Sequence, residues 1–337
     1  MNNLFASFDW NLIFNAKVFL IPLILGVIFL VEKKWGAVLG GALSGLPLVS
    51  GTLMCFSVFH QTPEDYTQSL YGAIEGVVAL SLMVFAYSKM TYAVSGGYDM
   101  RLSGKERGSI LLKSLLIYIV ISAIFSSLQG KLNHLISFNV AIPFIFIAVC
   151  TVLNFFLYKN LPKIKPDENK VNFKFKNSIY MMLIGTITFS VFSSIKTYGP
   201  AASLIGLIST APFYLSIVIF MTHKISTDYD ALHLNQGILM GLFGYLLFFS
   251  VFLIGLTILQ LAPEVVVPAA ILLTISSYFI YAIKFRSKNK KEVTRMSREG
   301  TNPMIPAEES ISDISLDSLK DDLLLADIKD QAIEKSV

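Results

Sequence analysis

Apolar residues occur along this chain in long runs separated by short polar segments. Nine runs approach or exceed the length of about 20 residues that a helix needs to cross the hydrocarbon core of a bilayer. This pattern predicts an all-α, polytopic helical membrane protein with about nine transmembrane helices. The eighth run is long for one helix, which leaves a strong tilt, a bend near Gly244 or two shorter spans open. The runs are 12–31, 36–59, 66–90, 109–127, 138–158, 177–195, 198–221, 231–260 and 264–285.

Composition supports a membrane protein and excludes some partners. The chain of 337 residues is 54% hydrophobic and 15% charged, whereas soluble domains are about 25% charged. The basic residues lie in short segments between the runs, where membrane orientation explains them, so no nucleic acid is expected as a partner. Cys55 and Cys150 both lie inside apolar runs and predict neither a disulfide nor a metal site.

Lysine and arginine set the predicted orientation, because loops rich in these residues stay in the cytoplasm. Basic residues follow the first, third, fifth and ninth runs, and the intervening loops hold few of them. Nine spans with the N-terminus outside and the C-terminus in the cytoplasm of a bacterial inner membrane satisfy this pattern. Ten spans would place the basic segment 284–298 outside.

The second run, Gly36 to Phe59, is interrupted near its middle. Pro47 removes a backbone donor, and nearby glycines such as Gly51 weaken the helix further. Transporters build substrate sites from helices broken in this way. The alternative is a kinked packing helix, since the pair Gly41 and Gly45, four residues apart, lets helices approach closely.

The chain also matches itself weakly at an offset of 161 residues. This offset aligns Leu43–Leu46 with Leu204–Leu207 and Gly76 with Gly237. Spans one to four then correspond to spans six to nine in the opposite direction, as in the inverted repeats of many transporters. Chance similarity between apolar helices is the alternative. The predicted organisation is a first membrane repeat of five spans, a second of four spans and a cytoplasmic tail: 1–160, 161–286 and 287–337.

Glu75 is the most informative single side chain, because it lies inside the third span. Carboxylates at membrane depth are costly and tend to face cavities in ion pathways, so Glu75 is a candidate proton carrier. Its counterpart at the 161-residue offset is Gln236, which has Asn235 and His233 beside it. Alternatively, Glu75 lies near the outer boundary and hydrogen-bonds a serine or tyrosine.

Hydroxyl groups form a second polar set in the interrupted runs. They are candidates for a substrate pathway, although such groups also commonly bond their own helix. The pathway residues are Ser50, Thr52, Ser209 and Thr210, and the predicted helix breaks are Pro47, Gly51, Pro200 and Pro212.

Four residues near position 230 resemble metal-ligand chemistry: His223, Asp228, Asp230 and His233. Their spacing matches no known kind of metal site, and a solvated cytoplasmic loop explains them better, so neither a metal nor a cofactor is expected. Motifs for nucleophilic, zinc-dependent and phosphate-binding chemistry are missing from the sequence, so an enzyme is not expected. The remaining enzymatic hypothesis, action on lipid, would depend on the outer residues His60, Glu64 and Asp65.

The tail changes from basic to acidic. Its first part could lie against anionic headgroups. The distal part has apolar residues near helical spacing: Leu316, Leu319, Leu323 and Ile328. This part is either a short amphipathic helix that docks a protein partner or, as the composition favours, a largely disordered segment.

Part of the chain resembles the helix pair of GlpM-type bacterial membrane proteins. This part comprises the stretch from Gly45 to Thr52, the acidic turn after it, and the stretch from Gly72 to Tyr87. In its inverted-repeat layout the chain is similar to the drug/metabolite transporter superfamily, whose members usually have ten spans. These resemblances imply export or exchange of small molecules. The leading hypothesis is therefore a multi-pass secondary transporter of a small molecule with proton coupling. The alternative is a membrane scaffold or accessory subunit that docks a partner through its tail.

Overall fold

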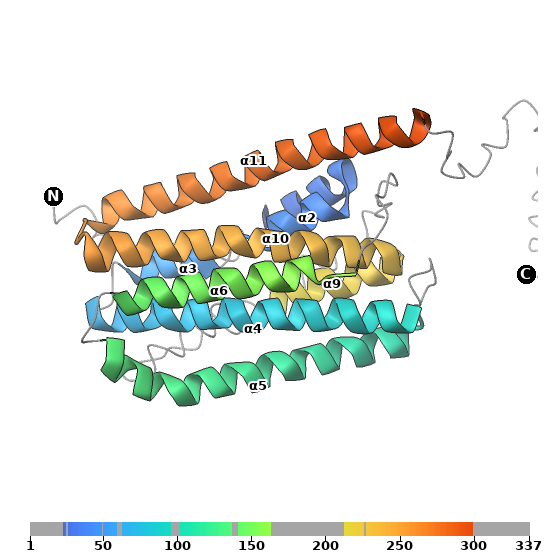
Figure 1. The fold of residues 1–337 in the computed structure, drawn as a ribbon. Coiled ribbons are helices and arrows are strands. Elements are labelled where there is room, and N and C mark those ends of the chain that lie inside the picture. Colours follow the sequence, from blue (N-terminus) through green and yellow to red (C-terminus); the bar gives the residue numbers. More distant parts are fainter. Residues whose placement is uncertain are drawn as a thin grey trace, which may run out of the picture. The chain divides into compact units, whose positions relative to one another are not determined.

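The computed structural model describes residues 23–24, 26–48, 50–58, 63–95, 102–136, 141–162, 212–225 and 227–298. Every regular element in these ranges is a helix (Figure 1). The chain separates into two compact units, Met1–Ala282 and Ile283–Val337, and the account below concerns the first. After a helical stretch at 26–35, its helices are α2 (Ala37–Ser44), α3 (Ser50–Ser57), α4 (Pro63–Ser95), α5 (Gly104–Ile136), α6 (Ala141–Lys159), α9 (Phe213–Ile225), α10 (Asp228–Leu253), the π-helical η2 (Ile254–Ile258) and α11 (Pro263–Arg298), which continues into the second unit.

Four of the described helices are long and apolar enough to cross a membrane. They correspond to segments of α4, α5, α10 and α11: Tyr66–Ser95, Gly104–Phe125, Asp228–Leu256 and Pro263–Phe285. The class predicted from the sequence, a helical membrane protein, therefore agrees with the structure. The predicted spans 177–195 and most of 12–31 and 198–221 lie outside the described residues, and the count of nine stays a prediction.

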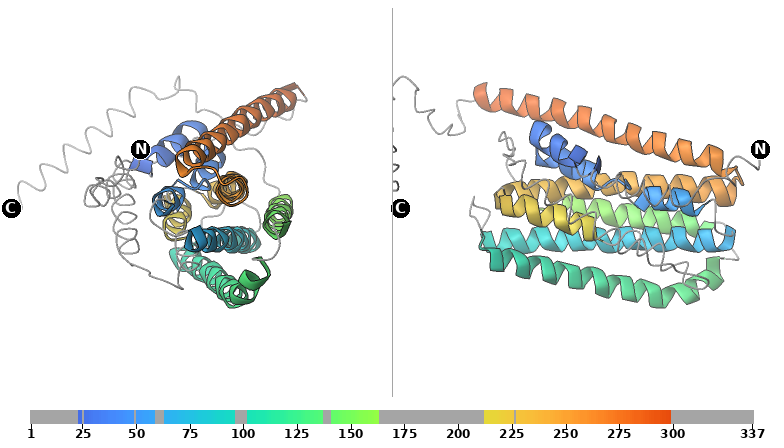
Figure 2. Two further views of the ribbon diagram at one scale, coloured as in Figure 1. Left: turned by 90° about the vertical axis from the view of Figure 1, so that its left-hand side faces the viewer. Right: turned by 180° about the vertical axis from the view of Figure 1, so that it is seen from behind.

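Two central helices, α4 and α10, run antiparallel to each other (Figure 1). At one end the rings of Tyr66 and Phe252 lie 6.2 Å apart, and at the other Tyr87 lies beside the residues that precede α10. α5 packs against α4, and α6 packs against both central helices, as the end-on view shows (Figure 2). The apolar window of α4 is 83% buried, whereas that of α5 is only 17% buried.

The outer helices expose large apolar side chains along whole faces. Soluble monomers rarely show contiguous apolar patches of this kind, whereas lipid tails cover them without cost. The exposed side chains on α5, α6 and α11 include Leu112, Leu116, Ile119, Val120, Ile145, Val149, Val152, Phe156, Leu272 and Phe279.

The backbones of α2 and α10 touch through glycines. A Cβ atom placed on Gly41 would lie 2.0 Å from the carbonyl oxygen of Leu234, and one on Gly237 would lie 2.0 Å from that of Val38. Gly45 and Gly241 meet in the same way one turn further along. The close approach predicted as the alternative role of the Gly41–Gly45 pair is therefore present, together with the helix interruption that follows it.

Several helices differ from the predicted runs, α10 and α11 among them. α10 passes through Gly244 without ending and then continues as η2. Gly244 is a packing position, since a Cβ there would lie 2.6 Å from Leu46 Cδ2. α11 extends 13 residues past the predicted end at residue 285. The extension contains no glycine or proline, and its basic residues suit the C-terminal end of a helix. The residues of the tail beyond Arg298 lie outside the described part.

The proposed repeat makes a specific demand on this packing. At the offset of 161 residues, the α2–α10 contact corresponds to a contact between residues 198–205 and α4. Residues 198–205 lie outside the described part of the chain, so the inverted repeat remains a prediction.

Candidate functional site

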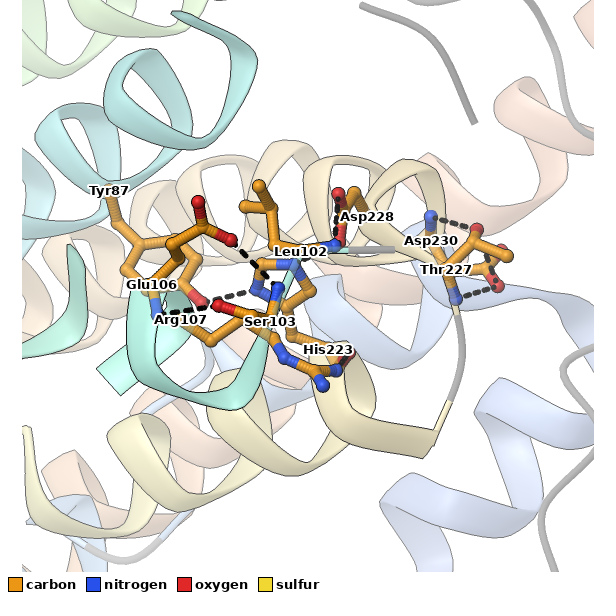
Figure 3. Close-up of polar contacts among 9 residues, drawn as sticks. All are labelled: Tyr87, Leu102, Ser103, Glu106, Arg107, His223, Thr227, Asp228 and Asp230. Carbon is orange, nitrogen blue, oxygen red and sulfur yellow. Dashed lines mark hydrogen bonds and ion pairs between the residues drawn. The ribbon is translucent and has the colours of Figure 1, made fainter. Parts of the chain in front are cut away.

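A buried polar network joins four helices at one end of the bundle (Figure 3). The Tyr87 hydroxyl of α4 lies 2.6 Å from Nδ1 of His223 on α9, and Nε2 of His223 lies 2.5 Å from Oδ1 of Asp228, the first residue of α10. The backbone N–H of Leu102, just before α5, donates to both oxygens of Asp228. Arg107 of α5 donates to the backbone carbonyl of His223.

Local sequence places the two acidic members of this region. Thr227 caps α10: its hydroxyl accepts from the backbone N–H of Asp230, and the Asp230 carboxylate accepts from the backbone N–H of Thr227. Such a capping box satisfies two backbone donors that a helix start leaves free. Asp228 follows the cap directly, where the partial positive charge of the helix N-terminus stabilises a carboxylate. The short link between α9 and α10 then brings His223 within reach.

His223 lies beyond the seventh predicted span, and its charge state follows from its surroundings. Burial lowers the pKa of His223 below its ordinary value, against the opposing effects of the hydrogen bond and charge of Asp228. A neutral imidazole has one donor and one acceptor nitrogen. We therefore assign the proton to Nε2, which donates to Asp228, while Nδ1 accepts from the Tyr87 hydroxyl.

The solvated loop predicted for this region is wrong. His223 is fully buried, and Asp228 is 1% exposed, because α4 and α5 cover them. The network connects four helices by buried hydrogen bonds, which gives it a structural role.

Glu75 lies deep inside the bundle. It is 12 residues from the start of α4, about 18 Å along the helix axis, and its side chain is 2% exposed. Its oxygen Oε2 has no hydrogen-bond partner. The Cys150 thiol of α6 lies near this carboxyl. Glu75 therefore lies within the bundle and not at its end, and its position relative to a bilayer stays a prediction.

The structure does not join Glu75 to its predicted partners on α10. Two contacts give the register of α4 against α10: Tyr66 lies beside Phe252, and Tyr87 lies near the start of α10. Counting along both helices between these contacts places Glu75 level with about residue 242 of α10. Gln236 is half-buried and lies roughly one and a half turns away along that helix. His233 is buried, and its Nδ1 lies 3.2 Å from the carbonyl oxygen of Tyr229. Its ring also packs edge-on against the Tyr229 ring.

Asn235 and Ser216 are buried polar groups without recorded hydrogen bonds. Asn235 is fully buried, and neither its amide oxygen nor its amide nitrogen has a partner; the Ser216 hydroxyl on α9 is equally unpaired. Each lies seven residues from a member of the network, Asp228 and His223 respectively. Seven residues are close to two helical turns, so both groups lie on the same helix faces, about 10 Å deeper in the bundle. They could contact a polar solute there.

The interruption of the second run lies between Ser44, where α2 ends, and Ser50, where α3 begins. The Ser44 hydroxyl donates to the carbonyl of Gly40, and the backbone N–H of Gly51 donates to that of Pro47. The hydroxyl of Tyr245 on α10 donates to the Ser50 hydroxyl. The broken segment is therefore tied directly to a central helix.

We expect Tyr245→Phe to lower the free energy of unfolding by about 1 kcal/mol, because it removes this buried hydrogen bond. Ser50→Ala and the double variant complete a mutant cycle. Unfolding of the purified protein in detergent measures each step. A coupling energy near zero between the two positions would show that the bond contributes nothing to stability.

Several predicted site residues lie elsewhere or outside the described part. The side chain of Thr52 and the residues Ser209, Thr210 and Pro200 are not among those described. Pro212 directly precedes α9, where a helix tolerates the missing donor. The described residues include no group of three or more histidine, cysteine or acidic side chains that could hold a metal ion.

Several polar residues were missed from the sequence. Tyr87 and Tyr245 read as ordinary aromatic members of apolar runs. Glu32, which accepts from the Thr222 hydroxyl at 3.1 Å, read as part of a charged loop beside Lys33 and Lys34. A usable signal existed for Asn154, an amide inside the fifth span, which donates to the Leu239 carbonyl of α10.

Searches of protein-family models, curated proteins and solved structures find no match to this chain. The geometry described above therefore stands without a relative to compare.

Proposed function

We propose that this protein is a secondary transporter of a small molecule in a bacterial inner membrane, with protons moving through Glu75. The observation that carries the proposal is the buried Glu75 carboxyl, one oxygen of which is unpaired. It lies in α4, whose apolar segment is the most buried among the four long apolar helices described. A purely structural carboxyl at such a position would be expected to have its oxygens paired, because an unpaired buried group costs free energy.

The interrupted helix and the unpaired groups of Asn235 and Ser216 add support. Broken helices at bundle cores are a recurrent way to build solute sites in transporters. Amide and hydroxyl groups without protein partners can bind a neutral solute or water. The resemblance to GlpM-type proteins and the drug/metabolite transporter superfamily agrees with export or exchange of such a solute.

The orientation follows from the charges at one end of the bundle. The end of α4 and the start of α5 lie beside the end of α9 and the start of α10. The contacts are made by Tyr87, Leu102 and Arg107, and their partners are His223 and Asp228. Positively charged side chains gather around this end, which we therefore assign to the cytoplasm. They are Lys33, Lys34, Lys89, Lys105, Arg107 and Lys224.

Proton movement can be tested before a substrate is known. Proteoliposomes containing the full chain are adsorbed on a solid-supported membrane, and a pH jump from 8 to 6 is applied. We expect a protein-dependent transient current that Glu75→Gln removes. Glu264→Gln, which alters an exposed carboxyl at the start of α11, should leave it unchanged.

Two results would refute the coupling role: no current from the unaltered protein, or an equal current from Glu75→Gln. Radiolabelled amino acids, sugars, nucleosides and amines then form the uptake panel for the substrate. Deleting residues 300–337 should leave transport intact. Loss of the phenotype on this deletion would favour the scaffold alternative, for which the described residues supply no observation.

A further inference from the structure

Glu32 is another buried carboxyl group, at the same end of the bundle as the Tyr87–His223–Asp228 network. It lies on the helical stretch 26–35 and is fully buried. One oxygen, Oε1, accepts from the Thr222 hydroxyl of α9 at 3.1 Å, and the other, Oε2, has no partner. The backbone of α2 covers it closely, since a Cβ on Gly40 would lie 2.7 Å from the Glu32 Cβ.

The surroundings of Glu32 are negative. The helical stretch 26–35 ends three residues after Glu32, at residue 35. α9 likewise ends three residues after Thr222, at residue 225. The C-terminal ends of helices carry partial negative charge. Burial, and to a smaller extent the nearby carboxylate of Asp230, raise the pKa of Glu32 to about 8, against the opposing effect of the Thr222 hydrogen bond.

The described basic side chains near Glu32 are exposed or contact other groups. Lys33 and Lys34 beside it and Lys224 beside Thr222 are exposed. Arg107 contacts the carbonyl of His223. Among the described residues, the basic and acidic side chains in direct contact are His223 and Asp228, which leaves Glu32 out.

We propose that Glu32 and Thr222 form a binding site for a sodium ion. Carboxylate and hydroxyl oxygens are hard ligands, which suit alkali and alkaline-earth cations rather than the transition metals that favour histidine and cysteine. Asp230 is already stabilised by Thr227 and by the N-terminus of α10. Glu32 therefore supplies the one carboxyl group of this site, and a single carboxylate matches the charge of a monovalent ion. In transporters, helix C-terminal ends often coordinate sodium.

This site is separate from Glu75 and does not depend on the transport proposal. Thr222 precedes His223, whose partner Tyr87 lies 12 residues beyond Glu75 on α4. That spacing corresponds to about 18 Å along the helix. Sodium binding can therefore be measured whether or not Glu75 carries protons.

The test is thermal unfolding of the full chain, purified in detergent without sodium. Sodium chloride is titrated against choline chloride at constant ionic strength. A ligand that binds the folded state raises the unfolding midpoint. We expect a saturable rise for the unaltered protein and for Glu264→Gln, no rise for Glu32→Gln, and an apparent Kd at least tenfold weaker for Thr222→Val.

Binding of radioactive ²²Na⁺ gives a second measurement that does not depend on the stability of a variant. One ion per chain is expected, displaced by unlabelled sodium and not by choline. The proposal is overturned if the unaltered protein neither binds ²²Na⁺ nor responds to sodium, or if Glu32→Gln responds equally. A rise with magnesium chloride but not with sodium chloride would overturn the assignment to a monovalent ion.

Discussion

Gly237→Leu is expected to lower the free energy of unfolding by at least about 3 kcal/mol, the upper part of the range for overpacked positions. Any Cβ at this position would lie 2.0 Å from the Val38 carbonyl oxygen. That atom belongs to the backbone of α2, so no side-chain rotation can relieve the overlap. The two helices would have to separate, and the contacts at Gly41, Gly45 and Gly241 would be lost with them.

Gly108→Ala is the matched control, because a Cβ on Gly108 would meet no atom within 4 Å. Alanine is the better helix former, so this variant should be as stable as the unaltered protein or slightly more stable. Thermal unfolding in detergent, followed by size-exclusion fluorescence, compares the two. Equal midpoints for Gly237→Leu and Gly108→Ala would show that α2 does not pack on α10 as described.

Asp228→Ala is expected to cost about 3 kcal/mol, because it leaves two buried hydrogen-bond donors without an acceptor. The Nε2–H of His223 and the backbone N–H of Leu102 would both lose their acceptor inside the protein. Glu106→Ala removes an acidic side chain from the first turn of α5, where it is exposed, and should have a much smaller effect.

The chain of hydrogen bonds also predicts coupling between its ends. Tyr87→Phe alone should cost about 1 kcal/mol, since it removes one buried hydrogen bond. In the Asp228→Ala background the imidazole is no longer held, so the same change should cost less. Denaturant unfolding of the four members of this cycle measures the difference, and simple additivity would exclude the arrangement in Figure 3.

The elements of the bundle could be predicted from local sequence. Long apolar runs outlined α4, α5, α6 and α11, because the bilayer requires such lengths. The interruption near Pro47 was visible because proline and glycine act on the backbone where they stand. The depth of Glu75 was likewise predictable from its place inside an apolar run.

The buried network was not predictable in the same way. His223, Asp228 and Glu32 lie just outside apolar runs, where a polar residue is normally solvated. Their burial results from contacts with α4, α5 and α2, which are distant in sequence. The same holds for the pairing of Glu75 with Gln236: the offset aligned them, but the antiparallel register of α4 and α10 places them at different depths.

The glycine contacts between α2 and α10 limit how the interrupted helix can move. Two backbones in direct contact behave as one rigid body, since sliding either would force carbonyl oxygens into neighbouring chain atoms. A conformational cycle would therefore leave α2 stationary beside α10. The Tyr245–Ser50 bond ties the start of α3 to the same helix, so both halves of the interrupted run are anchored to α10.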